Sequence, residues 1–92
     1  MVGGMKSTID TLKRYFNESA LVQVGGELTL KTNVLTFKFE EPYLYFTYII
    51  KDKYVEELIN MDIIQFRNNV AYVKCEKGTY SFYFYKENNV ES

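Results

Sequence analysis

The chain has 92 residues, of which 47% are apolar and 25% are charged, and its 11 basic and 12 acidic side chains leave a net charge of −1. This size holds one hydrophobic core, and this balance lies far from the range in which chains stay disordered. The intermixed charges also exclude a long-range field that would steer the protein to nucleic acid or an anionic membrane, so neither is an expected partner. We predict a single domain over residues 1–92, with flexible ends at 1–6 and 87–92.

The residue types that most catalytic and metal sites need are scarce. There is no His, which is the commonest general base and metal ligand, and the single Cys75 cannot form an internal disulfide or a zinc site. The adjacent pairs Glu40-Glu41 and Glu56-Glu57 point in different directions on a strand or helix, so we expect them to be solvated. The sequence therefore predicts a protein that is not an enzyme and holds no cofactor or metal.

The first element is predicted to be an amphipathic helix over residues 8–18. Ser7 and Asp10 form a variant of the capping box, and Ile9, Leu12 and Phe16 recur at helical spacing.

The apolar period then changes to two, which is typical of half-buried strands. It predicts one strand through Leu28 and Leu30 and a second over residues 35–39, with a hairpin turn at Lys31-Thr32-Asn33. Gly25-Gly26 indicates either a tight turn or a strongly bent strand.

Residues 43–50 follow Pro42 and are apolar on both faces, as in a strand that is covered on both sides. Asp52 then resembles a helix cap, and Val55 and Ile59 share one side of the short helix that we predict over 52–60.

The last third is predicted to be a meander of three strands, over residues 63–67, 70–75 and 79–86. Turns are expected at Asn68-Asn69 and at residues 76–78. The fold class is therefore α+β: an N-terminal helix and a curled, mainly antiparallel sheet of about six or seven strands, as in a partly open barrel.

One stretch resembles a known family. The segment Gly26-Glu27-Leu28-Thr29-Leu30-Lys31-Thr32-Asn33-Val34-Leu35-Thr36-Phe37 is similar, without a gap, to the opening hairpin of GRAM and related pleckstrin-homology-like domains, in which Gly precedes Leu-x-Leu, a turn and Leu-x-Phe. Gly78-Thr79-Tyr80-Ser81-Phe82 resembles their later Gly-x-x-x-Phe hairpin, which extends the resemblance over residues 20–86. The resemblance implies a strongly bent, seven-stranded sheet that binds proteins or lipid headgroups. The headgroup role is not carried over, because the first hairpin offers only Lys31 and Lys38.

Tyrosine is the unusual residue, with nine copies beside seven Phe. Strand alternation places part of this set on the side opposite Leu44, Phe46, Ala71, Val73, Cys75, Phe82 and Phe84. If these outward sets share one side of the sheet, they form an interaction face of Tyr43, Tyr45, Tyr72, Lys74, Tyr83 and Tyr85. Tyrosine suits such a face because its ring gives a large contact area at low entropy cost. The alternative is that the rings only form cross-strand pairs or lie under a helix.

The functional prediction is a non-catalytic, cytoplasmic protein-binding module, such as a small inhibitor, immunity protein or adaptor, which binds a protein partner or a second copy of itself. The cytoplasmic location is expected because no apolar run reaches about 20 residues and the start lacks a secretory signal. One alternative is single-stranded nucleic-acid binding by aromatic stacking, with Lys74 and Arg67 nearby. The other is lipid-headgroup binding, as the family resemblance implies.

Overall fold

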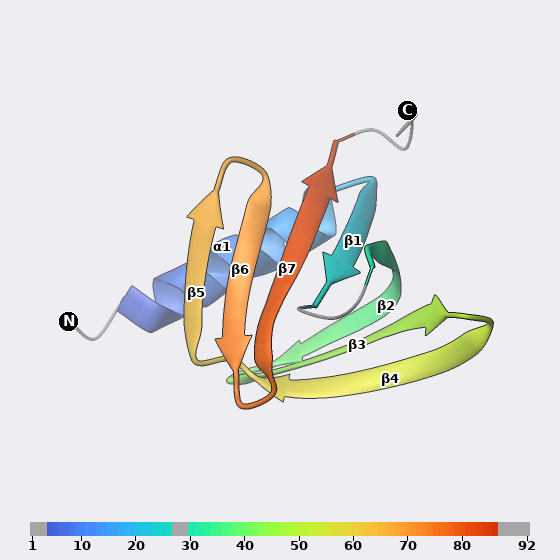
Figure 1. Ribbon diagram of the computed structural model, residues 1–92. Helices are drawn as coiled ribbons and strands as arrows, with labels where there is room; N and C mark the ends of the chain where they lie inside the picture. Colours follow the sequence, from blue (N-terminus) through green and yellow to red (C-terminus); the bar gives the residue numbers. More distant parts are fainter. Residues whose placement is uncertain (1–3, 27–29, 87–92) are drawn as a thin grey trace.

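The computed structural model describes residues 4–26 and 30–86, in which one helix is followed by seven strands (Figure 1). The elements are α1 (Gly4–Glu18), β1 (Leu21–Gly25), β2 (Thr32–Glu40), β3 (Tyr43–Ile50), β4 (Lys53–Asn60), β5 (Ile63–Arg67), β6 (Val70–Cys75) and β7 (Gly78–Tyr85). The predicted α+β class with a curled antiparallel sheet is confirmed.

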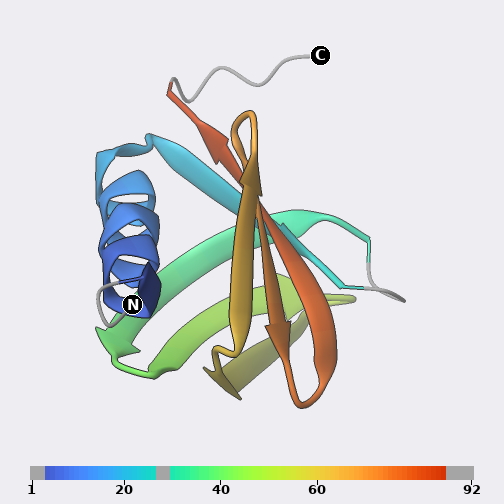
Figure 2. The ribbon, with the colours of Figure 1, turned by 90° about the vertical axis from the view of Figure 1, so that its left-hand side faces the viewer.

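The seven strands form one bent sheet in the order β4-β3-β2-β1-β7-β6-β5, with every neighbouring pair antiparallel. β1 and β2 join the two halves over a short ladder, in which Gln23 pairs with Asn33 and Val24 with Thr32. Figure 2 shows the half made of β2, β3 and β4 crossing the half made of β5, β6 and β7, with α1 on the concave side. This architecture is compatible with the pleckstrin-homology-like expectation.

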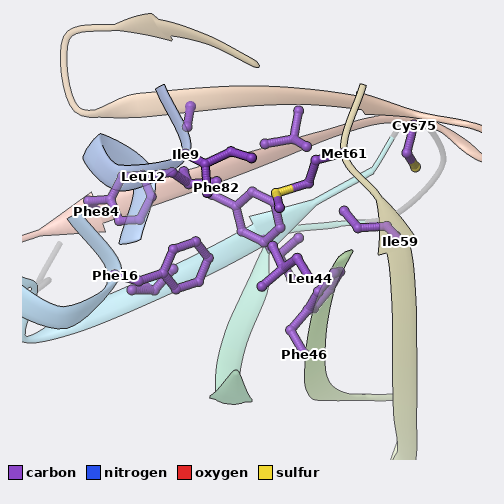
Figure 3. Close-up of a cluster of buried hydrophobic side chains, with 14 of the residues drawn as sticks. Ile9, Leu12, Phe16, Leu44, Phe46, Ile59, Met61, Cys75, Phe82 and Phe84 are labelled. Atoms are coloured by element: carbon purple, nitrogen blue, oxygen red, sulfur yellow. The ribbon is translucent and has the colours of Figure 1, made fainter. Parts of the chain in front are cut away.

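The helix packs into the concave side of the sheet through the apolar stripe that the sequence predicted. Ile9, Leu12 and Phe16 are all buried. The Phe16 ring centroid lies 4.8–5.3 Å from those of Phe37, Phe39, Phe82 and Phe84. Figure 3 shows these side chains of α1 pointing into the cluster that also contains Leu44 and Phe82. The helix begins at Gly4, four residues before its predicted start, and ends at Glu18 as predicted.

The predicted short helix over 52–60 is wrong, because these residues form strand β4. Lys51 and Asp52 have φ angles of 53° and 65°, and two positive φ values in a two-residue loop are the signature of a type I′ hairpin turn. Asp52 therefore lies in a turn and caps no helix. The spacing of Val55 and Ile59 is compatible with both a helix and a strand. These residues form a strand because the whole of β4 pairs with β3.

The first hairpin also differs from its prediction. The proposed turn at Lys31-Thr32-Asn33 is wrong, because β2 begins at Thr32 and Asn33 already pairs with β1. Leu30 is not in a strand and is 85% exposed, and the predicted strand through Leu28 falls partly on residues 27–29, outside the described residues. The first strand is instead formed by residues 21–25, in which Val22 and Val24 are buried, and this explains why the predicted hairpin is displaced.

The later meander is confirmed. β5 and β6 have the predicted bounds with Asn68-Asn69 as their turn, and β7 runs from Gly78 to Tyr85, one residue earlier than predicted at each end. Flexible ends were predicted at 1–6 and 87–92. Residues 1–3 and 87–92 lie outside the described residues, and residues 4–6 belong to α1.

Candidate interaction surfaces

The five tyrosines predicted to point outward do so, but they do not share one surface. None of them is buried: Tyr43 is 43% exposed, and Tyr45, Tyr72, Tyr83 and Tyr85 are half-buried. Because β2 and β1 separate β3 from β7 in the strand order, Tyr43 and Tyr45 lie on one half of the bent sheet and the other three on the other half. The single predicted face is therefore two faces.

The first surface is the outer side of β3 and β4, which we call the apolar face. It consists of Tyr43, Tyr45, Ile49, Tyr54 and Leu58. Tyr45 is directly opposite Leu58, and Ile49 is directly opposite Tyr54. Four of the five side chains are 43–59% exposed. Such an accumulation of exposed apolar side chains is typical of a contact surface.

Polar groups lie within and beside this apolar face. Glu56, directly opposite Thr47, stands between the Tyr45–Leu58 pair and the Ile49–Tyr54 pair. The Tyr45 hydroxyl donates a hydrogen bond of 3.1 Å to the Glu56 carboxylate, and the Lys38 ammonium lies 3.2 Å from the Glu40 carboxylate. Desolvation, followed by the neighbouring Glu56, raises the pKa of Tyr45 above its usual value of 10.0. A shallow pocket is lined by Lys38, Glu40, Tyr43, Tyr45 and Leu58.

The second surface is the outer side of β1, β7, β6 and β5, which we call the tyrosine–lysine face. It carries Gln23, Lys31, Gln65, Arg67, Tyr72, Lys74, Tyr83 and Tyr85. The ammonium of Lys31 lies 4.4 Å from the centre of the Tyr83 ring and 3.4 Å from the Tyr85 hydroxyl. That hydroxyl donates in turn to Gln23 Oε1 at 3.1 Å. A cation and an amide thus fix two neighbouring tyrosines.

Tyr72 extends this face towards the edge strand β5. It is directly opposite Ser81 on β7 and Gln65 on β5, which makes Tyr83 its diagonal neighbour. Gln65, Phe66, Arg67 and Tyr72 line a shallow pocket at this edge. Lys74, the charged residue of the predicted interaction face, is exposed two residues farther along β6.

The sequence interpretation missed a polar cluster on the concave side. Glu57 accepts hydrogen bonds from the Tyr48 hydroxyl at 3.1 Å and from the Lys77 ammonium at 2.9 Å, and only 17% of its side chain is exposed. The expectation that both Glu56 and Glu57 are solvated is thus wrong for Glu57. If residues 52–60 had been interpreted as a strand, alternation would have placed Glu57 on the same side as Val55 and Ile59.

This cluster changes the titration of its members. Desolvation and the Glu57 charge raise the pKa of Tyr48 from 10.0 to about 12. The same two causes raise the pKa of Tyr80, and the hydrogen bond to Glu57 raises that of Lys77. Through its hydrogen bonds and the charge of Glu57, the cluster joins β3, β4 and the turn before β7.

Within residues 4–26 and 30–86 no group of three or more His, Cys, Asp or Glu side chains could hold a metal ion. Cys75 is a free, buried thiol in β6, as its position beside Ala71 and Val73 predicted. In the described part of the chain, no helix has the length and apolar character needed to cross a bilayer.

Comparison with family models, with curated proteins and with solved structures finds no match for this chain.

Proposed function

We propose that the protein is a non-catalytic protein-binding module whose partner docks on the apolar face. The observation that carries this proposal is that four exposed apolar side chains lie on the same side of the sheet. Tyr43, Ile49, Tyr54 and Leu58 are each more than two-fifths exposed, and all four belong to the outer side of two adjacent strands. Exposed apolar side chains that gather on one side of adjacent strands are typical of a contact surface. The role of a small inhibitor, immunity protein or adaptor fits this arrangement.

The edge of β4 adds a second means of contact. In a two-residue hairpin the residues that flank the turn, here Ile50 and Lys53, exchange hydrogen bonds, and the pattern alternates from there. The backbone groups of Tyr54, Glu56 and Leu58 therefore point away from β3. The Ile49 carbonyl fits this phase, since it points away from β4 and accepts a hydrogen bond of 2.9 Å from the Thr32 hydroxyl on β2.

Among the described residues no strand pairs with this side of β4, so a partner strand has room to add there. Tyr54 and Leu58 would then contact the partner from the outer side of the sheet. The charges of Lys53 and Glu56 limit unspecific pairing with other exposed strands, which is how natural proteins protect their edges.

The test compares two exposed apolar residues on opposite edges of the sheet. Leu58 on β4 is 55% exposed and Ile63 on β5 is 46% exposed, so a lysine at either position has little effect on folding. If the partner is a second copy, light scattering gives twice the monomer mass for the wild type and for Ile63→Lys, and the monomer mass for Leu58→Lys.

If the partner is another protein, immobilised wild type and Ile63→Lys retain it from an extract of the source cells and Leu58→Lys does not. A monomeric wild type that retains no protein, or a partner that Leu58→Lys retains equally well, would count against the proposal.

The resemblance to GRAM and pleckstrin-homology-like domains implies lipid-headgroup binding, but this function has less support. The two cations of the first hairpin lie on different halves of the sheet, since Lys31 contacts Tyr83 and Lys38 is paired with Glu40. They therefore form no common cluster for a phosphate. Flotation with strongly anionic vesicles at low salt tests this alternative, and we expect the protein to stay unbound.

A further inference from the structure

We propose that the tyrosine–lysine face binds single-stranded nucleic acid. This site is separate from the apolar face and goes beyond the proposed function. It rests on three observations: the sign of the charges on this face, the spacing of its aromatic rings, and the open pocket at its edge.

The first observation is that the charges are segregated. The charged side chains on this face are Lys31, Arg67 and Lys74, and none of the side chains that project outward from β1, β5, β6 and β7 in the described part of the chain is a carboxylate. The outer side of the other half of the sheet is mixed, because it carries Glu40 and Glu56 as well as Lys38. The net charge of −1 thus conceals a face with three positive charges, which complements a polyanion.

The second observation is that aromatic rings lie between these cations. Tyr72 and Tyr83 are diagonal neighbours on β6 and β7, and Tyr85 follows on the same side of β7. Adjacent strands are about 4.8 Å apart, so the path from Arg67 on β5 to Lys31 beside β1 measures roughly 15–20 Å. This is the length of a few nucleotides, and unpaired bases stack on such rings with little dependence on sequence.

The third observation is that this face has polar groups and space for a base. The pocket lined by Gln65, Phe66, Arg67 and Tyr72 offers an amide, a guanidinium and two aromatic rings together at the sheet edge. Lys31 already occupies one side of the Tyr83 ring at 4.4 Å. A base that stacks there takes the place of the ammonium, which then contacts the adjacent phosphate.

This combination selects among polyanions. An acidic peptide would use the three cations but not the flat rings, and a duplex hides the faces of its bases. A single strand uses both, because its phosphates contact the cations while its bases stack on the tyrosines.

The test measures the fluorescence anisotropy of a labelled oligothymidylate as protein is added at low salt. We expect binding that weakens with salt, with a log–log slope of about −2 for three cations that each contact one phosphate of a single strand. Tyr72→Ala and Tyr83→Ala each reduce the affinity by about tenfold or more, whereas Tyr72→Phe and Tyr83→Phe retain it, because stacking needs the ring and not the hydroxyl. Arg67→Gln and Lys74→Gln each make the salt slope shallower by about 0.7.

Matched controls come from the other half of the sheet. Lys38→Gln and Tyr54→Ala remove an exposed cation and an exposed ring there, and both variants retain the wild-type affinity. The proposal is overturned by the absence of binding at low salt, or by an affinity that the two alanine variants do not change. It is also overturned if polyglutamate binds as tightly and with the same dependence on the rings, which would assign this face to an acidic protein.

Discussion

The hydroxyl of Tyr48 donates a hydrogen bond of 3.1 Å to the carboxylate of Glu57, two residues from its direct partner Val55 across the β3–β4 ladder. On its other oxygen the same carboxylate accepts a hydrogen bond of 2.9 Å from Lys77 in the turn between β6 and β7. One side chain therefore connects the two halves of the bent sheet on the concave side.

Replacing Glu57 with Gln removes the negative charge that accepts hydrogen bonds from both Tyr48 and Lys77. We expect the free energy of unfolding to fall by about 1–2 kcal/mol. Hydrogen bonds to charged groups stabilise more than hydrogen bonds between neutral groups, but the Glu57–Lys77 pair is partly exposed, which limits the loss. Urea denaturation measures the change. The control is Glu56→Gln on the same strand, whose side chain points outward and contacts Tyr45, and we expect it to change the stability by no more than about 0.5 kcal/mol. Equal losses in both variants would refute the assigned role of Glu57.

Stability should depend on alkaline pH through Tyr48. Its folded pKa of about 12 lies above the unfolded value of 10.0, so the folded state holds the proton more tightly. The resulting stabilisation is complete below pH 10 and is lost as the pH rises from 10 to 12. The raised pKa of Lys77 acts in the same direction. We expect the urea midpoint of the wild type to fall more steeply over this range than that of Tyr48→Phe; equal slopes would contradict the prediction.

Phe16 is the main contact between helix and sheet, because its ring packs against four other Phe rings. Phe16→Ala should cost about 3–5 kcal/mol, as for other buried aromatic side chains that are truncated to alanine. Thermal or urea unfolding measures this loss. Arg14→Ala, on the exposed side of the same helix, provides the control and should change the stability by about 0.5 kcal/mol or less. A small effect of Phe16→Ala would mean that the sheet folds without the helix.

The β3–β4 turn can be improved. Lys51 and Asp52 both have positive φ, which residues other than Gly adopt at a steric cost, although Asn and Asp tolerate it better than most. Asp52→Gly should therefore stabilise the protein by up to about 1 kcal/mol, because glycine reaches this conformation without steric strain. Asp52→Ala is the control, since it removes the carboxylate and keeps a Cβ, and it should not stabilise. An increase in the unfolding midpoint for both variants would show that the charge, and not the backbone, is responsible.

The sequence alone determined the elements whose signals are local. The spacing of Ile9, Leu12 and Phe16 predicted the helix stripe. A run that is apolar on both faces predicted β3, and short runs between turn signals predicted β5 and β6 together with the turn at Asn68-Asn69. These features depend on neighbours within a few residues, so periodicity and turn chemistry are sufficient to find them. The outward direction of Tyr43, Tyr45, Tyr72, Tyr83 and Tyr85 followed from the same alternation.

The tertiary structure decided everything that depends on strand pairing. Residues 52–60 fit a helix and a strand about equally well, and only the ladder with β3 made them β4, which moved Glu57 to the concave side. The strand order also separated the tyrosines into two faces and collected Lys31, Arg67 and Lys74 on one of them. Such pairing joins residues far apart in the chain, and a shift of one position reverses which side chains point inward, so local patterns do not contain this information.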